Sequence, residues 1–379
     1  MADLFSQFRN ELKLNPEQAK VVNSITSCRT AQLGGHVDAC DECGHQNISY
    51  NSCRNRHCPK CQFLTKEKWI EKCSNDLLPC PYFHVVFTIP AELKPLAIRN
   101  KKLFFNLMFK AASASLKEVA KRPKNFGADV GFIGVLHTWT QELTFHPHIH
   151  FLVPGGGLSA DEAEWKSARE TFFLSVRVLS KVFRGKLLQL IEKNHGEFNC
   201  FGKIEDLKCV KSFKSLLVSC TKNEWVVYSK KPFAGPKQVV RYLGKYTHRI
   251  AISNYRLITL EKGIVHFRAR ARRKGSAKEK TRIIKLPATE FLKRFLQHVV
   301  PHGYTRIRHF GILGSRNKKD KLDKARKLLG EDKPQAQSET KQGWQVTLKE
   351  LTGIDVTKCL KCKKGIMRTV EDLPKLNSS

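Results

Sequence analysis

The residues best suited to chemistry lie in the stretch HPHIH, residues 146–150. Alternate residues of a β-strand point to the same face, so His148 and His150 would present two imidazoles to one side, with Ile149 on the other. Two imidazoles so placed can bind one divalent cation. His146 shares their parity, but the adjacent Pro147 leaves its direction open, and we assign it no role. The pattern predicts a metal site at His148 and His150.

A third ligand for this site would come from the preceding strand, which offers Gln141 and Glu142. These two residues have opposite parity, so at most one of them is expected to reach the metal. His137 shares the parity of Gln141 and lies farther back. Because oxygen donors combined with imidazole suit Mg²⁺ or Mn²⁺ better than a structural zinc, we expect one of these two ions.

A second candidate is the stretch RYLGKYTHR, in which Tyr242 and Tyr246 are four residues apart and share one face of a helix. Lys245 and Arg249 lie beside them. The tyrosines also continue an apolar stripe that begins at Val239, which is typical of a buried helix face. In the catalytic alternative, a tyrosinate attacks a phosphodiester whose oxygens a metal polarises, leaving a 5′-phosphotyrosine and a free 3′-hydroxyl.

The cysteines indicate a separate metal site near the N-terminus. The chain has 13 cysteines, an odd number, and several follow CxxC spacing, which favours metal thiolates in a reducing cytosol over disulfides. Cys40 and Cys43 form one such pair, and Cys58 and Cys61 form the next. Four thiolates satisfy tetrahedral Zn²⁺, so we expect one structural zinc at these four cysteines, in a zinc-ribbon-like module.

The sequence leaves other potential zinc ligands unassigned. A second site, or a replacement ligand for the first, could use any of five nearby residues: Cys28, His36, His45, Cys53 and His57. Near the C-terminus, Cys359 and Cys362 give half a ribbon, whose partners the sequence does not identify.

The charge of the chain points to nucleic acid as its partner. Lysine and arginine number 68 against 34 acidic residues, a formal net charge of +34. Such an excess repels itself unless a polyanion is bound, and DNA phosphates supply that partner. A ribosome-associated or basic membrane-surface protein is the alternative. No apolar run is long enough to span a membrane and no signal peptide is evident, so we expect a cytoplasmic, nucleoid-associated protein.

Three arginines in GIVHFRARARRKG, Arg268, Arg270 and Arg272, alternate along an expected strand. They would form one cationic edge suited to a DNA backbone, although a solvated basic strand would look the same. No GxxxxGK[ST] phosphate-binding loop is found, so strand separation would depend on negative supercoiling or a host helicase.

The expected elements position these residues in an α+β fold. Residues 83–90, 129–143 and 148–156 read as strands, the last two joined by a turn around residues 145–147, and residues 101–122 as a helix. The boundaries that follow are a zinc-binding, DNA-binding module (1–80), a nuclease domain (81–316), a charged linker (317–342) and a tail with one CxxC (343–379).

Taken together, these motifs resemble those of one known family. HPHIHFLVPGGG followed by QVVRYLGKYTHRIAISN is similar to the two-tyrosine HUH transposases of the insertion-sequence "ninety-one" family, as are NSCRNRHCPKCQ, LHTWTQEL and EFLKRFLQHVVPHGYTRIRHFGILG. The resemblance runs from about Cys28 to Cys362. It implies a zinc-binding N-terminal domain and an HUH nuclease core, which is an antiparallel sheet with flanking helices.

The resemblance also implies roles for individual residues. His148 and His150 match the histidine pair, Tyr242 and Tyr246 match the two nucleophiles, and Gln141 is preferred over Glu142 as the further ligand. The implied function is a DNA transposase that cleaves and rejoins single-stranded element ends and target by a rolling-circle-like route. The alternatives are a rolling-circle replication initiator or relaxase, and a non-catalytic zinc-ribbon DNA-binding protein.

Overall fold

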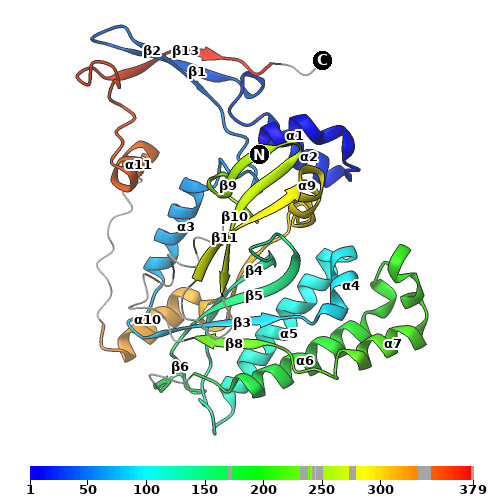
Figure 1. Ribbon diagram of the computed structural model, residues 1–379. Helices are drawn as coiled ribbons and strands as arrows, with labels where there is room; N and C mark the ends of the chain where they lie inside the picture. Colours follow the sequence, from blue (N-terminus) through cyan, green and yellow to red (C-terminus); the bar gives the residue numbers. More distant parts are fainter. Residues whose placement is uncertain are drawn as a thin grey trace. The chain divides into compact units, whose positions relative to one another are not determined.

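The computed structural model describes residues 1–169, 173–230, 238, 240, 244, 251–272, 279–331 and 343–376 (Figure 1). The chain forms two compact units. Unit 1 comprises Met1–Lys68, His248–Val299 and Pro334–Ser379, and unit 2 comprises Trp69–Thr247 and Val300–Lys333. This division differs from the expected linear series of domains, because segments from both ends of the chain pack together in unit 1.

Unit 2 is built on a five-stranded antiparallel sheet with the order β12-β4-β5-β3-β8. Its strands are β3 (Tyr82–Thr88), β4 (Phe132–Trp139), β5 (Phe145–Pro154), β8 (Val227–Lys230) and β12 (Ile307–Phe310). β-Branched and aromatic residues dominate these segments, as expected for a pleated, largely buried surface. The predicted α+β class with an antiparallel sheet is confirmed.

One face of this sheet carries the main hydrophobic core. Phe87 of β3 and Ile149 and Phe151 of β5 are fully buried there against α5 (Lys101–Lys121) and α6 (Val176–Lys193). Both helices lie along the sheet in Figure 1, with α4 (Lys94–Arg99) and α7 (Val210–Ser219) beside them. Ile149 therefore points away from the histidine face, as its position between two histidines predicts.

The opposite face of the sheet is covered at one end by a second apolar cluster. Ile133 of β4 and Leu152 of β5 pack there with Leu322 and Ala325 of α10 (Lys318–Leu328). The first part of the expected charged linker is therefore a packed helix, because its charged residues alternate with an apolar stripe. The remaining elements that the described residues of unit 2 form are short: η3 (Ala91–Leu93), β6 (Gly156–Leu158), β7 (Trp165–Ser167), η4 (His195–Glu197), η5 (Gly202–Lys208) and η7 (Gly311–Leu313). Helix α3 (Phe63–Asn75) spans the boundary between the units.

Unit 1 contains two three-stranded antiparallel sheets. The first has the order β13-β1-β2, with β1 (Gly35–Cys40), β2 (Gln46–Tyr50) and β13 (Met367–Leu373). The second has the order β11-β10-β9, with β9 (Leu257–Glu261), β10 (Ile264–Arg272) and β11 (Glu279–Pro287). Because β13 pairs with β1, the C-terminal tail belongs to the same module as the N-terminal cysteines.

Helices cover one face of the second sheet. Phe291 of α9 (Ala288–Gln297) contacts Phe267 of β10, with ring centroids 5.3 Å apart. One helical turn farther along α9, Phe295 contacts Phe5 of α1 (Ala2–Phe8), and Gln18 of α2 (Pro16–Thr26) donates a hydrogen bond to the carbonyl of Leu296. The other helical elements of unit 1 are η1 (Arg9–Glu11), η2 (Ala31–Leu33), η6 (Asn254–Arg256) and α11 (Trp344–Thr352).

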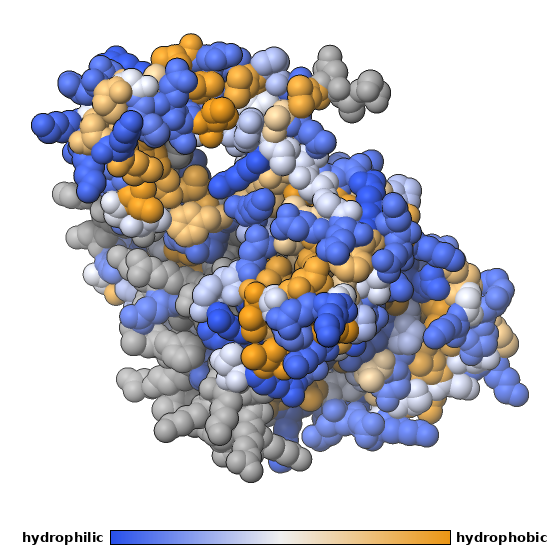
Figure 2. Space-filling view, turned by 45° about the horizontal axis from the view of Figure 1, so that its top comes forward, coloured by the Kyte–Doolittle hydropathy of each residue, from blue (hydrophilic) through white to orange (hydrophobic). Residues whose placement is uncertain are grey.

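The surface in view is mainly hydrophilic, with small scattered apolar patches (Figure 2). That distribution fits a chain with a formal net charge of +34. Among the described residues, no helix has the length and apolar character that a membrane crossing requires.

Candidate metal centres

Three histidines converge on the same face of the unit 2 sheet as Ile133 and Leu152, that is, the face opposite the main hydrophobic core. The register of β4 and β5 places His137 directly opposite His148, with His150 diagonal to it. One ring nitrogen from each of His137, His148 and His150 lies within 4.8 Å of the others. Residues opposite one another in antiparallel strands share a face, which is why these three side chains meet.

His137, and not only the two predicted histidines, belongs to the group of potential ligands, while the role assigned to Gln141 remains a prediction. Strand β5 begins at Phe145, so the turn lies at residues 140–144 and not at residues 145–147 as expected. Gln141 is in this turn, whereas His137 is 2% exposed on the histidine face. Glu142, the alternative, is not among the groups of potential metal ligands in the described part of the chain.

A hydrogen bond to the backbone orients the imidazole of His148. Its Nδ1 lies 2.7 Å from the carbonyl oxygen of His146. A carbonyl can only accept, so Nδ1 carries the proton and Nε2 presents its lone pair to the group. His146 thus contributes through its backbone, a role that the sequence did not indicate.

A fourth histidine, His84 of β3, supports His150. His84 Nε2 lies 2.7 Å from His150 Nδ1, and the two rings are nearly parallel. When His150 Nδ1 donates to His84, His150 Nε2, which is buried, keeps its lone pair for a metal. Sequence reasoning missed His84. Alternation along the expected strand at residues 83–90 could have placed it on a face, but not beside His150.

Burial keeps these imidazoles neutral. Desolvation lowers the pKa of His84 and of His148 to about 4, and the pKa of His150 well below its ordinary value. For His150, the neighbouring histidines act in the same direction. Neutral imidazole is the form that binds a metal, so the residues fit a divalent cation near neutral pH.

The first cysteine group lies in unit 1 and consists of Cys28, Cys53, Cys58 and Cys61. The sulfur of Cys61 is 3.2 Å from that of Cys28 and 3.6 Å from that of Cys53. All 13 cysteines are free thiols. A tetrahedral zinc with Zn–S bonds of about 2.3 Å separates its sulfurs by roughly 3.8 Å, so this group is close to the required size.

The second cysteine group joins the two ends of the chain. It pairs Cys40 with Cys362 and Cys43 with Cys359, each pair with sulfurs 3.7 Å apart. The amide of Gly365 donates to the Cys362 sulfur and lowers the pKa of that thiol to about 6. A Cβ at Gly365 would lie 2.4 Å from the Cys40 sulfur, so the position requires glycine.

The prediction that Cys40, Cys43, Cys58 and Cys61 together bind one zinc is therefore wrong. Cys40 and Cys43 belong to one group, and Cys58 and Cys61 belong to the other, because β13 returns to β1 and brings the C-terminal CxxC with it. Within the described residues, neither group includes the other histidines considered, His36, His45 and His57. The unidentified partners of Cys359 and Cys362 are thus Cys40 and Cys43.

The predicted nucleophiles and several cationic residues lie outside the described residues. These are Tyr242, Lys245, Tyr246 and Arg249, together with the side chain of Arg272. Arg268 and Arg270 are exposed on β10. The roles assigned to these residues remain predictions.

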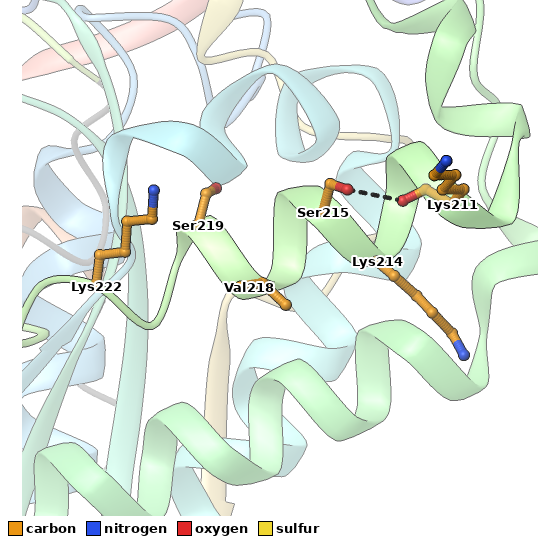
Figure 3. Close-up of a pocket in the computed structure, with 6 residues that line it drawn as sticks. All are labelled: Lys211, Lys214, Ser215, Val218, Ser219 and Lys222. Atoms are coloured by element: carbon orange, nitrogen blue, oxygen red, sulfur yellow. Dashed lines mark hydrogen bonds between the residues drawn. The ribbon is translucent and has the colours of Figure 1, made fainter.

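A separate pocket of about 350 Å³ lies on helix α7 (Figure 3). It is lined by Lys211, Lys214, Ser215, Val218, Ser219 and Lys222, and the Ser215 hydroxyl donates to the Lys211 carbonyl at 3.0 Å. None of these side chains belongs to the histidine or cysteine groups. The pocket offers positive charge but no acid–base pair for catalysis.

A strongly basic chain that has both an antiparallel sheet bearing a histidine cluster and two cysteine groups defines a metal-binding protein of the nucleic-acid-acting class. A family described as "Putative transposase" matches residues 131–321, and one described as "Transposase zinc-binding domain" matches residues 1–89. The chain belongs to the IS91 family of transposases, and it carries the N-terminal zinc-binding domain of that family.

Individual relatives agree with this assignment. The chain is 44% identical over 380 residues to "Putative transposase y4qJ" of Sinorhizobium fredii, covering 98% of this chain and 94% of the relative. It is 28% identical over 307 residues to "Transposase for insertion sequence element IS801" of Pseudomonas savastanoi pv. phaseolicola, covering 79% and 71%. The predicted rolling-circle transposase is confirmed, with DNA as its partner and zinc as a structural metal, and neither alternative function is favoured.

Among solved structures, a copper-bound conjugative relaxase, TrwC, in complex with oriT DNA matches 43% of this chain and 68% of its own chain. The sequence identity is 11% and the TM-score is 0.24. A structural similarity at this level does not support a conclusion about function.

Proposed function

We propose that this transposase cleaves single-stranded DNA at the ends of its element and rejoins it through a 5′-phosphotyrosine. The observation that supports the proposal most directly is the group formed by His137, His148 and His150, whose ring nitrogens lie within 4.8 Å of one another. Three protein ligands leave at least one coordination position for a substrate oxygen, which is the arrangement of a catalytic site.

A divalent cation held by these histidines would polarise the non-bridging oxygens of the scissile phosphate. The sequence predicts Mg²⁺ or Mn²⁺ at this site. With three imidazoles in place of an oxygen ligand, the donor set favours Mn²⁺ over Mg²⁺, because Mg²⁺ prefers oxygen. The hydrogen bonds from His148 to the His146 carbonyl and between His150 and His84 would hold the ligand rings in place.

Tyr242 or Tyr246 would supply the nucleophile. Its phenolic oxygen forms a bond to phosphorus, the bond from phosphorus to the 3′-oxygen breaks, and that oxygen leaves as a 3′-hydroxyl after taking up a proton. The phenolic proton is lost to solvent. Because the phosphotyrosine retains the ester, a 3′-hydroxyl can later attack it and rejoin the DNA without a further energy source.

The basic residues would position the strand. Arg268, Arg270 and Arg272 of β10, with Lys245 and Arg249, are proposed to contact phosphates, since such contacts fix the register of the DNA without reading its sequence. The duplex would be opened by negative supercoiling or by a host helicase.

A cleavage assay tests the proposal. Labelled single-stranded oligonucleotides carrying an element end are incubated with the zinc-loaded protein and Mn²⁺, and the covalent adduct is detected on a denaturing gel. We expect Tyr242→Phe combined with Tyr246→Phe to abolish the adduct. Tyr50→Phe is the matched control, since Tyr50 is a 39% exposed tyrosine on β2 of unit 1 and should be dispensable. An adduct that survives in the double variant would overturn the assignment of the nucleophiles.

A further inference from the structure

The sheet β9-β10-β11 of unit 1 has one face buried and one face open. On β10, Val265, Phe267 and Ala269 are at most 1% exposed, and Phe267 packs against α9. Side chains alternate along a strand, so His266, Arg268 and Arg270 point to the other face. Arg268 and Arg270 are exposed there.

The neighbouring strand extends this open face. The register of β10 and β11 places Lys285 opposite His266, Ile283 opposite Arg268, and Thr281 opposite Arg270. Ile283 is 58% exposed and Lys285 is also exposed, so the face combines positive charge with uncovered apolar surface. Among the described residues, two carboxylate residues are paired on the same face of this sheet, Glu261 opposite Ile264 at one end and Glu279 opposite Arg272 at the other.

An exposed aromatic ring lies next to this face. Tyr255 of η6 is 79% exposed, and the Arg268 guanidinium lies 5.5 Å from the centre of its ring. The neighbouring Arg256 donates a hydrogen bond of 2.7 Å to the Arg268 carbonyl, which ties η6 to β10. Tyr255 is therefore attached to the sheet through its neighbour, while its own ring is left open to solvent.

We infer that this open face is a binding surface for single-stranded DNA, with Tyr255 stacking on an unpaired base and the cationic side chains contacting the phosphates. Arg268, Arg270 and Lys285 provide charge complementary to a phosphate backbone. An exposed aromatic beside them suits a single strand, whose bases can stack on it, better than a duplex, whose bases are already stacked. The inference rests on the proposed function and adds to it the stacking residue and the surface that holds the strand.

Binding to a fluorescent oligothymidine of about 20 nucleotides, longer than the roughly 4–16 nucleotides that such a surface covers, tests the inference. The full-length, zinc-loaded protein is titrated without added Mg²⁺ or Mn²⁺, so that cleavage does not interfere. We expect Tyr255→Ala to weaken binding by about tenfold, the size of one lost stacking contact, and Tyr255→Phe to restore it.

A matched control is available in unit 2. Phe201 is 49% exposed, and the Arg99 guanidinium lies 4.3 Å from the centre of its ring. The local chemistry is thus like that of Tyr255, but Phe201 lies outside the proposed surface, so Phe201→Ala should leave the dissociation constant unchanged. An equal loss in both variants would overturn the inference.

Salt dependence separates stacking from charge. Arg270→Gln should reduce the slope of log K against log salt by about 0.7, the value for one phosphate contact on a single strand, whereas Tyr255→Ala should leave the slope unchanged. The inference is also overturned if Tyr255→Ala binds the oligothymidine normally, as a surface for a protein partner would predict, or if it weakens binding to a duplex of the same length equally. Adduct formation is measured separately with Mn²⁺, so loss of the proposed cleavage mechanism leaves the outcome at Tyr255 interpretable.

Discussion

The histidine group of unit 2 and the cysteine groups of unit 1 offer a metal different surroundings. Each cysteine group brings four sulfurs together, with measured separations of 3.2 to 3.7 Å, which fills a tetrahedral shell. The histidine group brings three imidazole nitrogens together and leaves a position for another ligand. A metal in a cysteine group can therefore hold the fold together, whereas a metal in the histidine group can also bind a substrate.

The groups also differ in what holds them together. His137 and His148 lie on adjacent strands of one hairpin, so the sheet itself positions them. Cys40 and Cys362 are 322 residues apart, in a small module with few buried side chains. We therefore expect the histidine group to persist without its metal, and the sheet β13-β1-β2 to depend on zinc.

The largest effect is expected for the substitution of a histidine ligand. His148→Ala should reduce DNA cleavage by more than about a hundredfold, because a metal held by the histidines would supply several kcal/mol of charge stabilisation in the transition state. Zinc content should be unchanged. Initial rates of adduct formation at saturating Mn²⁺ measure this effect. The exposed His302 provides the control substitution, His302→Ala. Cleavage at the normal rate in His148→Ala would remove the distinction between the two kinds of centre.

At the second cysteine group, a substitution is expected to change zinc content and stability. Cys362→Ser should reduce the zinc content from two ions per chain to one and lower the temperature at which unit 1 unfolds, since the link between β1 and β13 is lost. Metal analysis and thermal unfolding provide the measurements. Cys209 is exposed and outside both groups, so Cys209→Ser is the matched control. Two zinc ions retained in Cys362→Ser would contradict the pairing.

A smaller effect is expected at His84, which contacts His150 but is not one of the three grouped ligands. His84→Ala should weaken Mn²⁺ binding by about 10- to 100-fold, the usual cost of losing a hydrogen bond that orients a ligand. His84→Gln, which can still accept a hydrogen bond, should recover part of the affinity. Titration of cleavage rate against Mn²⁺ concentration separates this loss of affinity from a change in the rate at saturation. Equal affinity in all three proteins would show that His84 does not position His150.

The smallest effect concerns pH. Burial lowers the pKa of His84 and of His148 from 6.5 to about 4, so between these values the folded state binds fewer protons than the unfolded state. Without a metal at the histidines, the free energy of unfolding should therefore fall as pH is lowered from about 6.5 to 4. Removing one of these groups in His148→Gln should reduce the slope. Urea unfolding at several pH values, with zinc supplied, measures the difference, and identical slopes would contradict the assigned burial.

Part of this organisation could be predicted from the sequence. Strand alternation placed His148 and His150 on one face with Ile149 on the other, because that inference needs only local geometry. The sequence does not identify His137 as a ligand, since its approach to His148 depends on where β4 turns into β5, and the sequence pattern predicts that turn several residues too late. The cysteine pairing depends on a strand that returns more than 300 residues later, which no local spacing records.

Mass spectrometry of the trapped adduct tests most directly whether the histidine group serves a tyrosine that attacks DNA. The protein is incubated with a single-stranded element end and Mn²⁺, digested, and searched for a nucleotide-modified peptide. We predict that the modification is on Tyr242 or Tyr246 and that it is absent when His148 is replaced by alanine. A modification on any other residue, or one that forms equally well in His148→Ala, would contradict the account.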